Sequence, residues 1–337
     1  MAKEAGKNRL FQLVVTIIIL AAILVALVWY YQQTTKPPLN IHAKVPAGIK
    51  HIKSLYGAGA GDNFDKPEST ALDKYGNIYV ADTGKNRIVV FDSGGNFERI
   101  IGDKKSTPVP LGVAVSDNNR IYVTSLMQRQ LSILDNEGKL IKKVNFKEKA
   151  QTPLKVAIHQ NKLYLTAIGQ IMVLDMNGNV KQRWGREGRN LGEFRYPNGI
   201  AIGKVGKLST GIIVSDSNNN RIQILDMEGK PKFYLGQPPK NLMDETLTFG
   251  LPAGLALDED GQVFVVDMFN NAIRVFDNNG EDLGQLGKRG SADGTYYYPT
   301  DIKLITGNRF IITDKWNDRV QICELTVGEA KKVNTKK

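Results

Sequence analysis

The chain has 337 residues, of which 42% are hydrophobic, enough for a large folded core. Lys and Arg outnumber Asp and Glu by 45 to 34, and part of this excess lies near the chain ends. The charge of the body is typical of a solvated surface and argues against a nucleic-acid-binding protein. Cys323 is the single cysteine, which excludes an intramolecular disulfide.

The N-terminal part predicts a single transmembrane helix. Residues 10–35 carry no charge, and Leu10–Tyr31 is almost entirely apolar. As a helix this stretch would extend roughly 33 Å, close to the roughly 30 Å hydrocarbon core of a bilayer. We expect residues 1–9 to form a cytoplasmic tail, residues 10–31 a signal-anchor and residues 32–45 a linker. A cleaved signal peptide is the alternative, but its apolar region would be shorter and an Ala-x-Ala-like site is missing.

A repeated phrase follows the linker. Residues 77–92 read as two short apolar strands around a polar turn, and similar phrases recur at residues 212–226, 264–277 and 310–322. Each unit opens with a proline and a short apolar run. Because the units recur at a near-fixed period, they indicate a repeat architecture. The prolines that open the six units are Pro67, Pro110, Pro153, Pro197, Pro252 and Pro299.

Each unit predicts four antiparallel strands joined by turns rich in Gly, Asn and Asp, which favour tight hairpins. The fold class is therefore all-β: a six-bladed β-propeller of four-stranded antiparallel blades, preceded by one transmembrane helix. The sixth unit lacks its fourth strand, whereas residues 49–57 carry that signature. We expect this segment to close the ring, so that the propeller spans residues 46–326 and residues 327–337 form a basic tail.

The chain resembles the NHL-repeat family of six-bladed propellers, in a membrane-anchored form. The resemblance covers Ile49–Leu325 and rests on the Pro-x-Gly-Ile-Ala run, the Gly-Asn-Ile-Tyr-Val-Ala-Asp phrase and the Asp…Asn-Arg-Ile spacing. Some NHL-like propellers are amidating lyases with histidine-bound metal, but His42, His51 and His159 do not converge here. The resemblance thus implies a binding protein rather than that enzyme.

Charged pairs at the strand ends are interpreted as structural. An aspartate ends the second strand, and an arginine opens the third strand five residues later, so the two side chains lie side by side. Unit 5 keeps the aspartate but has Ala272 in place of the arginine, and units 2 and 3 have neither residue. The structural residues are Asp82, Arg87, Asp216, Arg221, Asp267, Asp314 and Arg319.

A metal site is an alternative interpretation. Six-bladed gluconolactonase-like enzymes, which the chain is also similar to, hold a divalent cation at the channel mouth, and Glu68, Asn198 and Asp301 occupy comparable positions. Lys155 would be unfavourable beside a cation. The alternative function is therefore a divalent-metal-dependent hydrolase or lactonase; the main interpretation requires neither metal nor cofactor and has no catalytic residues.

The second-to-third-strand loops indicate a binding face, because apolar residues replace the usual polar ones. We expect a non-catalytic scaffold or sensor that binds a protein or cell-envelope ligand outside the cytoplasm, with no nucleic-acid partner. The alternative is that these side chains fold back and plug the channel. The predicted binding face comprises Leu126, Met127, Ile168, Met268, Phe269, Lys315 and Trp316.

Overall fold

The computed structural model describes residues 20–26, 46–236 and 249–328. The chain divides into two units, residues 1–41 and residues 42–337. Residues 20–26 are helical, and the rest of the predicted span Leu10–Tyr31 lies outside the described residues. Over the described ranges, no helix is both long enough and apolar enough to cross a bilayer.

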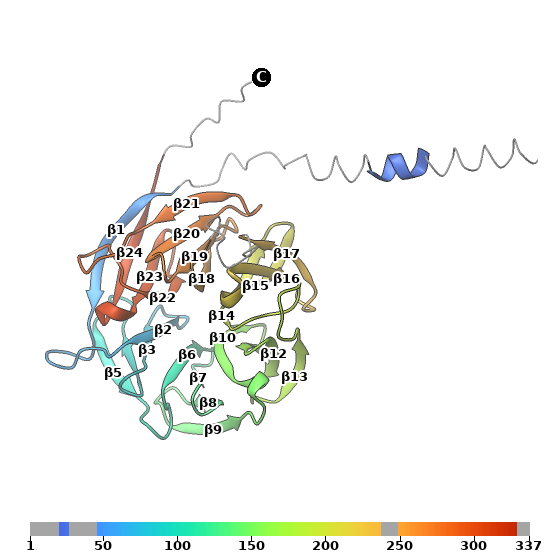
Figure 1. Ribbon diagram of the computed structural model, residues 1–337. Coiled ribbons are helices and arrows are strands. Elements are labelled where there is room, and N and C mark those ends of the chain that lie inside the picture. Colours follow the sequence, from blue (N-terminus) through green and yellow to red (C-terminus); the bar gives the residue numbers. More distant parts are fainter. Residues whose placement is uncertain (1–19, 27–45, 237–248, 329–337) are drawn as a thin grey trace, which may run out of the picture. The chain divides into compact units, whose positions relative to one another are not determined.

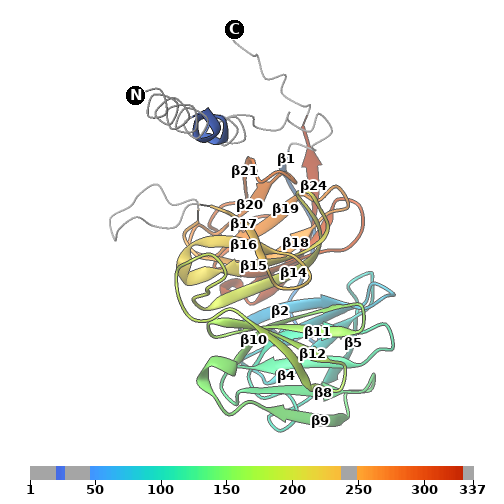
Figure 2. The same cartoon turned by 90° about the vertical axis from the view of Figure 1, so that its right-hand side faces the viewer.

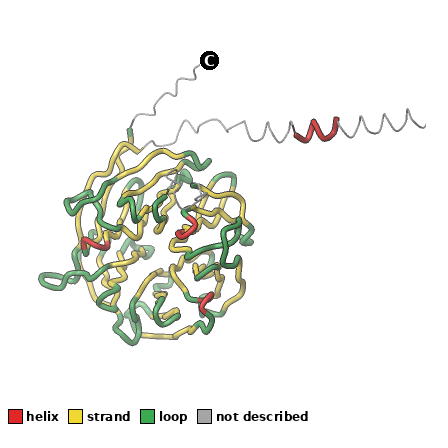
Figure 3. Tube along the Cα trace, in the orientation of Figure 1, coloured by secondary structure: helices red, strands yellow, loops and turns green. Residues whose placement is uncertain are grey.

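The second unit is a ring of six four-stranded antiparallel sheets around a central channel (Figure 1). Strands make up most of each blade, and loops join them (Figure 3). Each of the first three blades runs outward from the channel in chain order. Blade 1 comprises β2 (Pro67–Leu72), β3 (Ile78–Asp82), β4 (Arg87–Phe91) and β5 (Phe97–Ile101). Blade 2 comprises β6 (Pro110–Val115), β7 (Ile121–Ser125), β8 (Gln130–Leu134) and β9 (Leu140–Asn145). Blade 3 comprises β10 (Pro153–His159), β11 (Lys162–Ala167), β12 (Gln170–Asp175) and β13 (Val180–Trp184).

The fourth and fifth blades follow the same pattern, whereas the sixth takes one strand from the start of the ring. Figure 2 shows the blades from the side. Blade 4 comprises β14 (Pro197–Val205), β15 (Leu208–Asp216), β16 (Arg221–Leu225) and β17 (Pro231–Leu235). Blade 5 comprises β18 (Pro252–Leu257), β19 (Val263–Asp267), β20 (Ala272–Phe276) and β21 (Asp282–Leu286). Blade 6 comprises β22 (Pro299–Leu304), β23 (Arg309–Asp314), β24 (Arg319–Val327) and β1 (Pro46–Leu55).

The burial pattern explains why these sheets stand face to face. The second and third strands of blade 1 are buried along their whole length, as expected for sheets covered on both faces. The fourth strand of blade 2, β9, is largely exposed at the rim. Within the described part of the propeller, three short 3-10 helices interrupt the loops: η1 (Lys149–Gln151), η2 (Ser217–Asn219) and η3 (Lys315–Asn317).

Apolar side chains form a cluster at each junction between neighbouring blades. Between blades 5 and 6, for example, the rings of Phe264 and Phe310 lie 4.6 Å apart. The remaining junctions are packed in the same way, including the one between blades 6 and 1. The core is thus distributed around the ring, and each blade depends on both neighbours for burial.

The ring is closed by strands from the two ends of the described propeller. β1 pairs antiparallel with β24, from Pro46 opposite Val327 to Leu55 opposite Val320. Leu55 is buried among side chains of blades 1 and 6, so closure also contributes apolar contact. The pairing leaves no open sheet edge between the first and last blades.

Candidate functional site

The Asp–Arg pairs are buried next to the second-to-third-strand loops. In blade 1, Arg87 Nε donates to Asp82 Oδ2 at 2.7 Å, and the Asp65 backbone N–H donates to Asp82 Oδ1. Burial raises the pKa of the Asp82 carboxyl, against the opposing effect of those two donors. Asp216–Arg221 and Asp314–Arg319 repeat the geometry in blades 4 and 6. These pairs hold the loops that surround the channel mouth.

Blades without the pair fix their loops differently. In blade 2, Ser125 Oγ donates to Gln128 Oε1, and Gln130 Nε2 donates to Ser132 Oγ. In blade 5, Asp267 accepts the Leu251 backbone N–H without an arginine. Neutral contacts in blade 2 thus take over a role that an ion pair has in blades 1, 4 and 6.

A cavity of about 340 Å³, called here the mouth cavity, opens where the loops of five blades meet. Its volume falls within the range of small-molecule sites. Blade 3 contributes no lining residue among those described. The lining is Glu68, Thr83, Val109, Leu111, Leu126, Met127, Tyr196, Asn198, Ser217, Asn218, Leu251, Met268, Tyr298 and Lys315.

Four residues of the predicted binding face line this cavity: Leu126, Met127, Met268 and Lys315. Met127 is 69% exposed at the rim. The expectation of an exposed side chain is wrong for Met268, which is 4% exposed and packs into the core between blades 5 and 6. Ile168 is half-buried and lies outside the lining. Apolar loop residues thus divide between those that face solvent and those that fill space.

Phe269 and Trp316 belong to a row of aromatic rings beside the cavity. The Tyr298 ring lies 5.9 Å from Phe269 and 5.7 Å from Trp316, and Trp316 lies 5.3 Å from Tyr297. Phe269 is 58% and Trp316 is 54% exposed. We call these four residues the aromatic row. Because Tyr298 also lines the mouth cavity, the row and the cavity form one continuous surface.

Glu68 and Lys315, which line the mouth cavity, belong to an ionic group that also includes the buried Lys155. Lys315 Nζ donates to Glu68 Oε2 at 2.6 Å. Lys155 Nζ lies 3.7 Å from Glu68 Oε1 and donates to the backbone carbonyls of Glu68 and Leu111. Burial lowers the pKa of the Lys155 ammonium, and the charge of Glu68 offsets this only in part. Two lysines therefore surround one carboxylate.

Asp301 forms a second buried ionic group. Its Oδ1 pairs with Lys303 Nζ at 3.0 Å, and its Oδ2 accepts from Ser69 Oγ and the Thr70 backbone N–H. Burial opposes ionisation, but Lys303, Lys155 and the Thr70 N–H outweigh it and hold the pKa of Asp301 below its ordinary value. Asp301 therefore remains charged, and the groups that neutralise and hydrogen-bond it belong to the chain itself.

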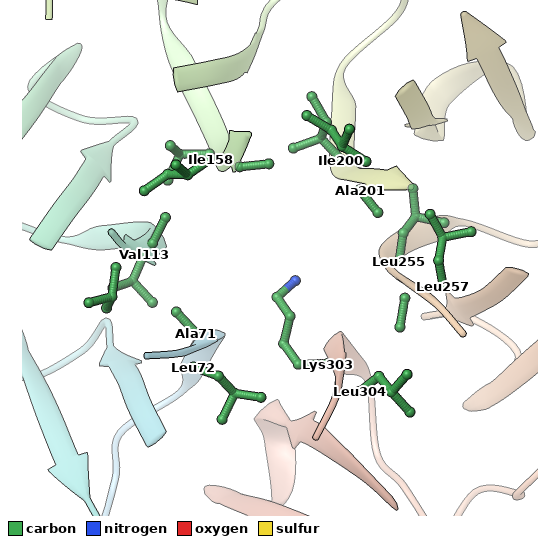
Figure 4. Close-up of a pocket in the computed structure, with 16 residues that line it drawn as sticks. Ala71, Leu72, Val113, Ile158, Ile200, Ala201, Leu255, Leu257, Lys303 and Leu304 are labelled. Carbon is green, nitrogen blue, oxygen red and sulfur yellow. The ribbon is translucent and has the colours of Figure 1, made fainter. Parts of the chain in front are cut away.

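A second cavity of about 330 Å³, called here the lower channel, is lined by the innermost strands of all six blades. Its walls are apolar residues of β2, β6, β10, β14, β18 and β22. Figure 4 shows Lys303 extending into this space among alanine, valine, leucine and isoleucine side chains. Apart from Lys303, the side chains that line the lower channel are apolar.

The alternative metal ligands are brought to the channel but already have cationic partners. Glu68 binds Lys315, Asp301 binds Lys303, and Asn198 lines the mouth cavity. No group of three or more His, Cys, Asp or Glu side chains within the described ranges is arranged to hold a metal ion. The metal site stays a prediction, and the lysines would oppose a cation there.

Tyr196 and Tyr298 line the mouth cavity but are not among the residues predicted for the binding face. Each directly precedes the proline of its blade and adopts a positive φ, 53° for Tyr196 and 55° for Tyr298. A residue before proline usually prefers extended backbone, so neither strand periodicity nor turn composition indicates this placement. The detectable signal was an aromatic residue before Pro197 and Pro299.

The fold and channel define the chain as a six-bladed β-propeller, and solved structures share this fold. A streptogramin B lyase structure has a TM-score of 0.59 at 15% identity, over 82% of this chain and 97% of that one. Kuenenia stuttgartiensis hydrazine synthase has a TM-score of 0.58 at 11% identity, over 81% and 100%. A Bacteroides thetaiotaomicron protein of unknown function reaches 0.63 at 16% identity, over 82% and 76%. At these identities the likeness concerns fold alone.

The NHL repeat family model matches residues 64–91, which include the second and third strands of blade 1. Protein brain tumor of Drosophila melanogaster is 28% identical over 145 residues, covering 31% of this chain and 14% of that protein. The match thus spans a small part of that relative's length. The chain thus contains a match to the NHL repeat within a six-bladed propeller.

Proposed function

We propose that this propeller is a non-catalytic scaffold or sensor that binds a protein or cell-envelope ligand through the mouth cavity and the aromatic row. The observation that carries the proposal is the continuity of these two features. Tyr298 lines the cavity and contacts both Phe269 and Trp316, which are more than half exposed. Apolar and aromatic surface gathered at one place is typical of binding sites. NHL propellers also commonly serve as protein-binding scaffolds.

The experiment is affinity capture from cell-envelope extracts with the full-length chain. The double variant Phe269→Ala and Trp316→Ala removes two exposed rings and should lose the captured ligand. A matched control, Tyr75→Ala with Tyr234→Ala, removes two rings that are 65% and 45% exposed away from the mouth cavity. Equal capture by the two double variants would contradict the proposal, provided that their thermal unfolding curves agree.

We also propose that the protein is anchored in a membrane through Leu10–Tyr31, with its N-terminus cytoplasmic and its propeller extracytoplasmic. The length and apolar character of this segment support the proposal. The full-length chain should remain in the membrane fraction after alkaline carbonate extraction, and external protease should digest the propeller in intact spheroplasts. The variant Leu20→Arg with Leu24→Arg should be released. Release of the unmodified chain would show that the segment is not an anchor.

A further inference from the structure

The propeller carries an excess of basic side chains on one face. We call this the mouth face: it consists of the loops before the innermost strands and the loops between second and third strands, at the same end of the channel. Among the described residues these loops contain 13 basic and 8 acidic side chains, a net charge of +5. The loops comprise residues 56–66, 83–86, 102–109, 126–129, 146–152, 168–169, 185–196, 217–220, 236, 249–251, 268–271, 287–298 and 315–318.

The opposite face is acidic, and the fold gives a reason. Its turns join the first strand to the second in every blade and the third strand to the fourth in blades 1 to 5. These turns contain 12 acidic and 5 basic side chains, a net charge of −7. Carboxylates stabilise tight turns there: Asp92 Oδ1, for example, accepts the backbone N–H groups of Gly94 and Asn96. The turns comprise residues 73–77, 92–96, 116–120, 135–139, 160–161, 176–179, 206–207, 226–230, 258–262, 277–281 and 305–308.

Many basic side chains of the mouth face are not used in this way. Seven of them are exposed and form no side-chain hydrogen bond or ion pair within the described residues. An anion that approaches the propeller is therefore repelled by the opposite face and attracted to the mouth face. The seven residues are Lys104, Lys105, Arg129, Lys147, Lys149, Arg189 and Lys288.

The mouth cavity, at the centre of this face, offers hydrogen-bond donors. Lys315 gives one N–H group to Glu68, and an ammonium group has three donors. Tyr196 and Tyr298 are half-buried, and neither hydroxyl forms a hydrogen bond within the described residues. Burial raises the pKa of the Tyr196 hydroxyl, so this group stays protonated and able to donate. The cavity thus favours an accepting group, and a carboxylate accepts through both of its oxygens.

The walls of the mouth cavity require an apolar group on the same ligand. Leu126, Met127, Leu251 and Met268 line the cavity, and Tyr298 connects it to the aromatic row. Nucleic acids and acidic polysaccharides are negatively charged but carry no aliphatic side chain. A polypeptide with acidic and apolar side chains meets both requirements, and apolar pockets beside aromatic rings commonly bind the anchoring side chains of partner proteins.

We infer that the mouth face binds an acidic segment of a partner protein, an inference that rests on the proposed binding function of this surface. An apolar side chain of the segment enters the mouth cavity, and a neighbouring carboxylate accepts from Lys315 and from the Tyr196 and Tyr298 hydroxyls. Further carboxylates meet the unpaired cations of the loops, and adjoining apolar side chains pack along the aromatic row.

Isothermal titration calorimetry tests the inference directly. The full-length chain is held in a zwitterionic detergent and titrated with short peptides that repeat Glu-Glu-Leu, Gln-Gln-Leu or Lys-Lys-Leu. The acidic peptide should bind, the neutral peptide should bind about tenfold more weakly, and the basic peptide should not bind. Salt at about 1 M shortens the Debye length to about 3 Å and should weaken the acidic peptide alone. Equal binding of the acidic and neutral peptides, or no binding of either, would overturn the inference.

Charge reversal separates the mouth face from the net charge of the protein. The double variant Arg129→Glu with Lys288→Glu reverses two exposed cations of the mouth face and should weaken binding of the acidic peptide severalfold. The matched control, Lys74→Glu with Lys139→Glu, makes the same change of charge at exposed turns of the opposite face and should leave that affinity unchanged. Equal affinities of the two double variants would mean that the mouth face does not receive the acidic segment.

Removal of two hydroxyl groups tests the place of the carboxylate. Tyr196→Phe with Tyr298→Phe keeps both rings and should weaken the acidic peptide by about tenfold, with no effect on the neutral peptide. Tyr75→Phe with Tyr234→Phe, at exposed rings away from the cavity, is the control and should change neither affinity. An unchanged affinity of the first variant for the acidic peptide would contradict the placement of the carboxylate in the mouth cavity.

Two further probes separate the classes of partner. Binding of a single-stranded oligonucleotide, or of the soluble lipid headgroup glycerophosphoglycerol, in place of the acidic peptide would contradict the inference. If envelope capture still depends on Phe269 and Trp316 in that case, the proposed binding function stands and only the partner class is wrong. Loss of that dependence as well would overturn both.

Discussion

The mouth cavity and the lower channel are similar in volume, but their lining side chains differ in how regularly they repeat from blade to blade. The innermost strands of all six blades line the lower channel, whereas the mouth cavity is lined by the first residues of these strands, the loops before them and the loops between second and third strands. Every blade contributes small or medium apolar residues to the lower channel, and these positions are the regular part of the repeat. The mouth has a different residue from each contributing blade, including Glu68, Asn198 and Lys315. The repeated positions thus maintain the ring, and the positions that vary between blades at the channel mouth create a site.

The largest effect is expected from opening the ring, on which both cavities depend. Deleting Pro46–Leu55 removes β1, exposes the edge of β24 and takes Leu55 from the core. The free energy of unfolding should fall by more than about 5 kcal/mol, beyond the range of ordinary substitutions. Urea denaturation measures the change. A truncation of residues 329–337 is the control, and equal stability of the two truncated chains would show that β1 is dispensable.

Lys155→Met should have the next largest effect, because it removes a buried charge beside Glu68. The backbone carbonyls of Glu68 and Leu111 would lose their donor, and Glu68 would keep only Lys315. Removing one member of a buried ionic group costs about 3–5 kcal/mol. Urea denaturation at neutral pH should detect this loss, whereas Lys74→Met, at an exposed turn, should change nothing. A fully stable Lys155→Met chain would mean that this ionic group is not needed for folding.

Asp301→Asn should have a smaller, pH-dependent effect. Because the folded-state pKa of Asp301 is below its ordinary value of 3.8, its charge stabilises the fold above that pH. This contribution is lost as the pH falls through the folded-state pKa. The variant should be about 2 kcal/mol less stable at pH 7 and should lack that part of the acid-induced loss. Denaturation curves across acidic pH check this, and parallel profiles for both chains would contradict it.

The smallest expected effect is that of calcium. The lysines beside Glu68 and Asp301 oppose a divalent cation, so calcium should leave the melting temperature of the full-length chain unchanged. Differential scanning calorimetry with calcium, and with chelator as the control, measures this. A rise in melting temperature that disappears in the Asn198→Leu variant would favour the metal-dependent hydrolase and would show that the lysines at the mouth do not exclude a cation.

The fold could be predicted because it repeats. Prolines such as Pro67 and Pro299 mark the start of each blade, and alternation of turns and apolar runs gives the strands. The site could be predicted only in part. Burial of Met268 depends on packing against the neighbouring blade, and the bond between Lys315 and Glu68 joins residues 247 positions apart. Contacts across a channel depend on how the blades curve around it, and no local pattern records that curvature.

The pairing of β1 with β24 also has a mechanical consequence. Because the two strands are antiparallel, Pro46 lies opposite Val327, so the chain enters the ring at the end of the seam where β24 leaves it. Tension on the segment before Pro46 therefore acts on this outermost pair before any other. The pairing of β1 with β24 would open one residue pair at a time toward Leu55. The resistance of the ring to this tension therefore depends on one strand, β1.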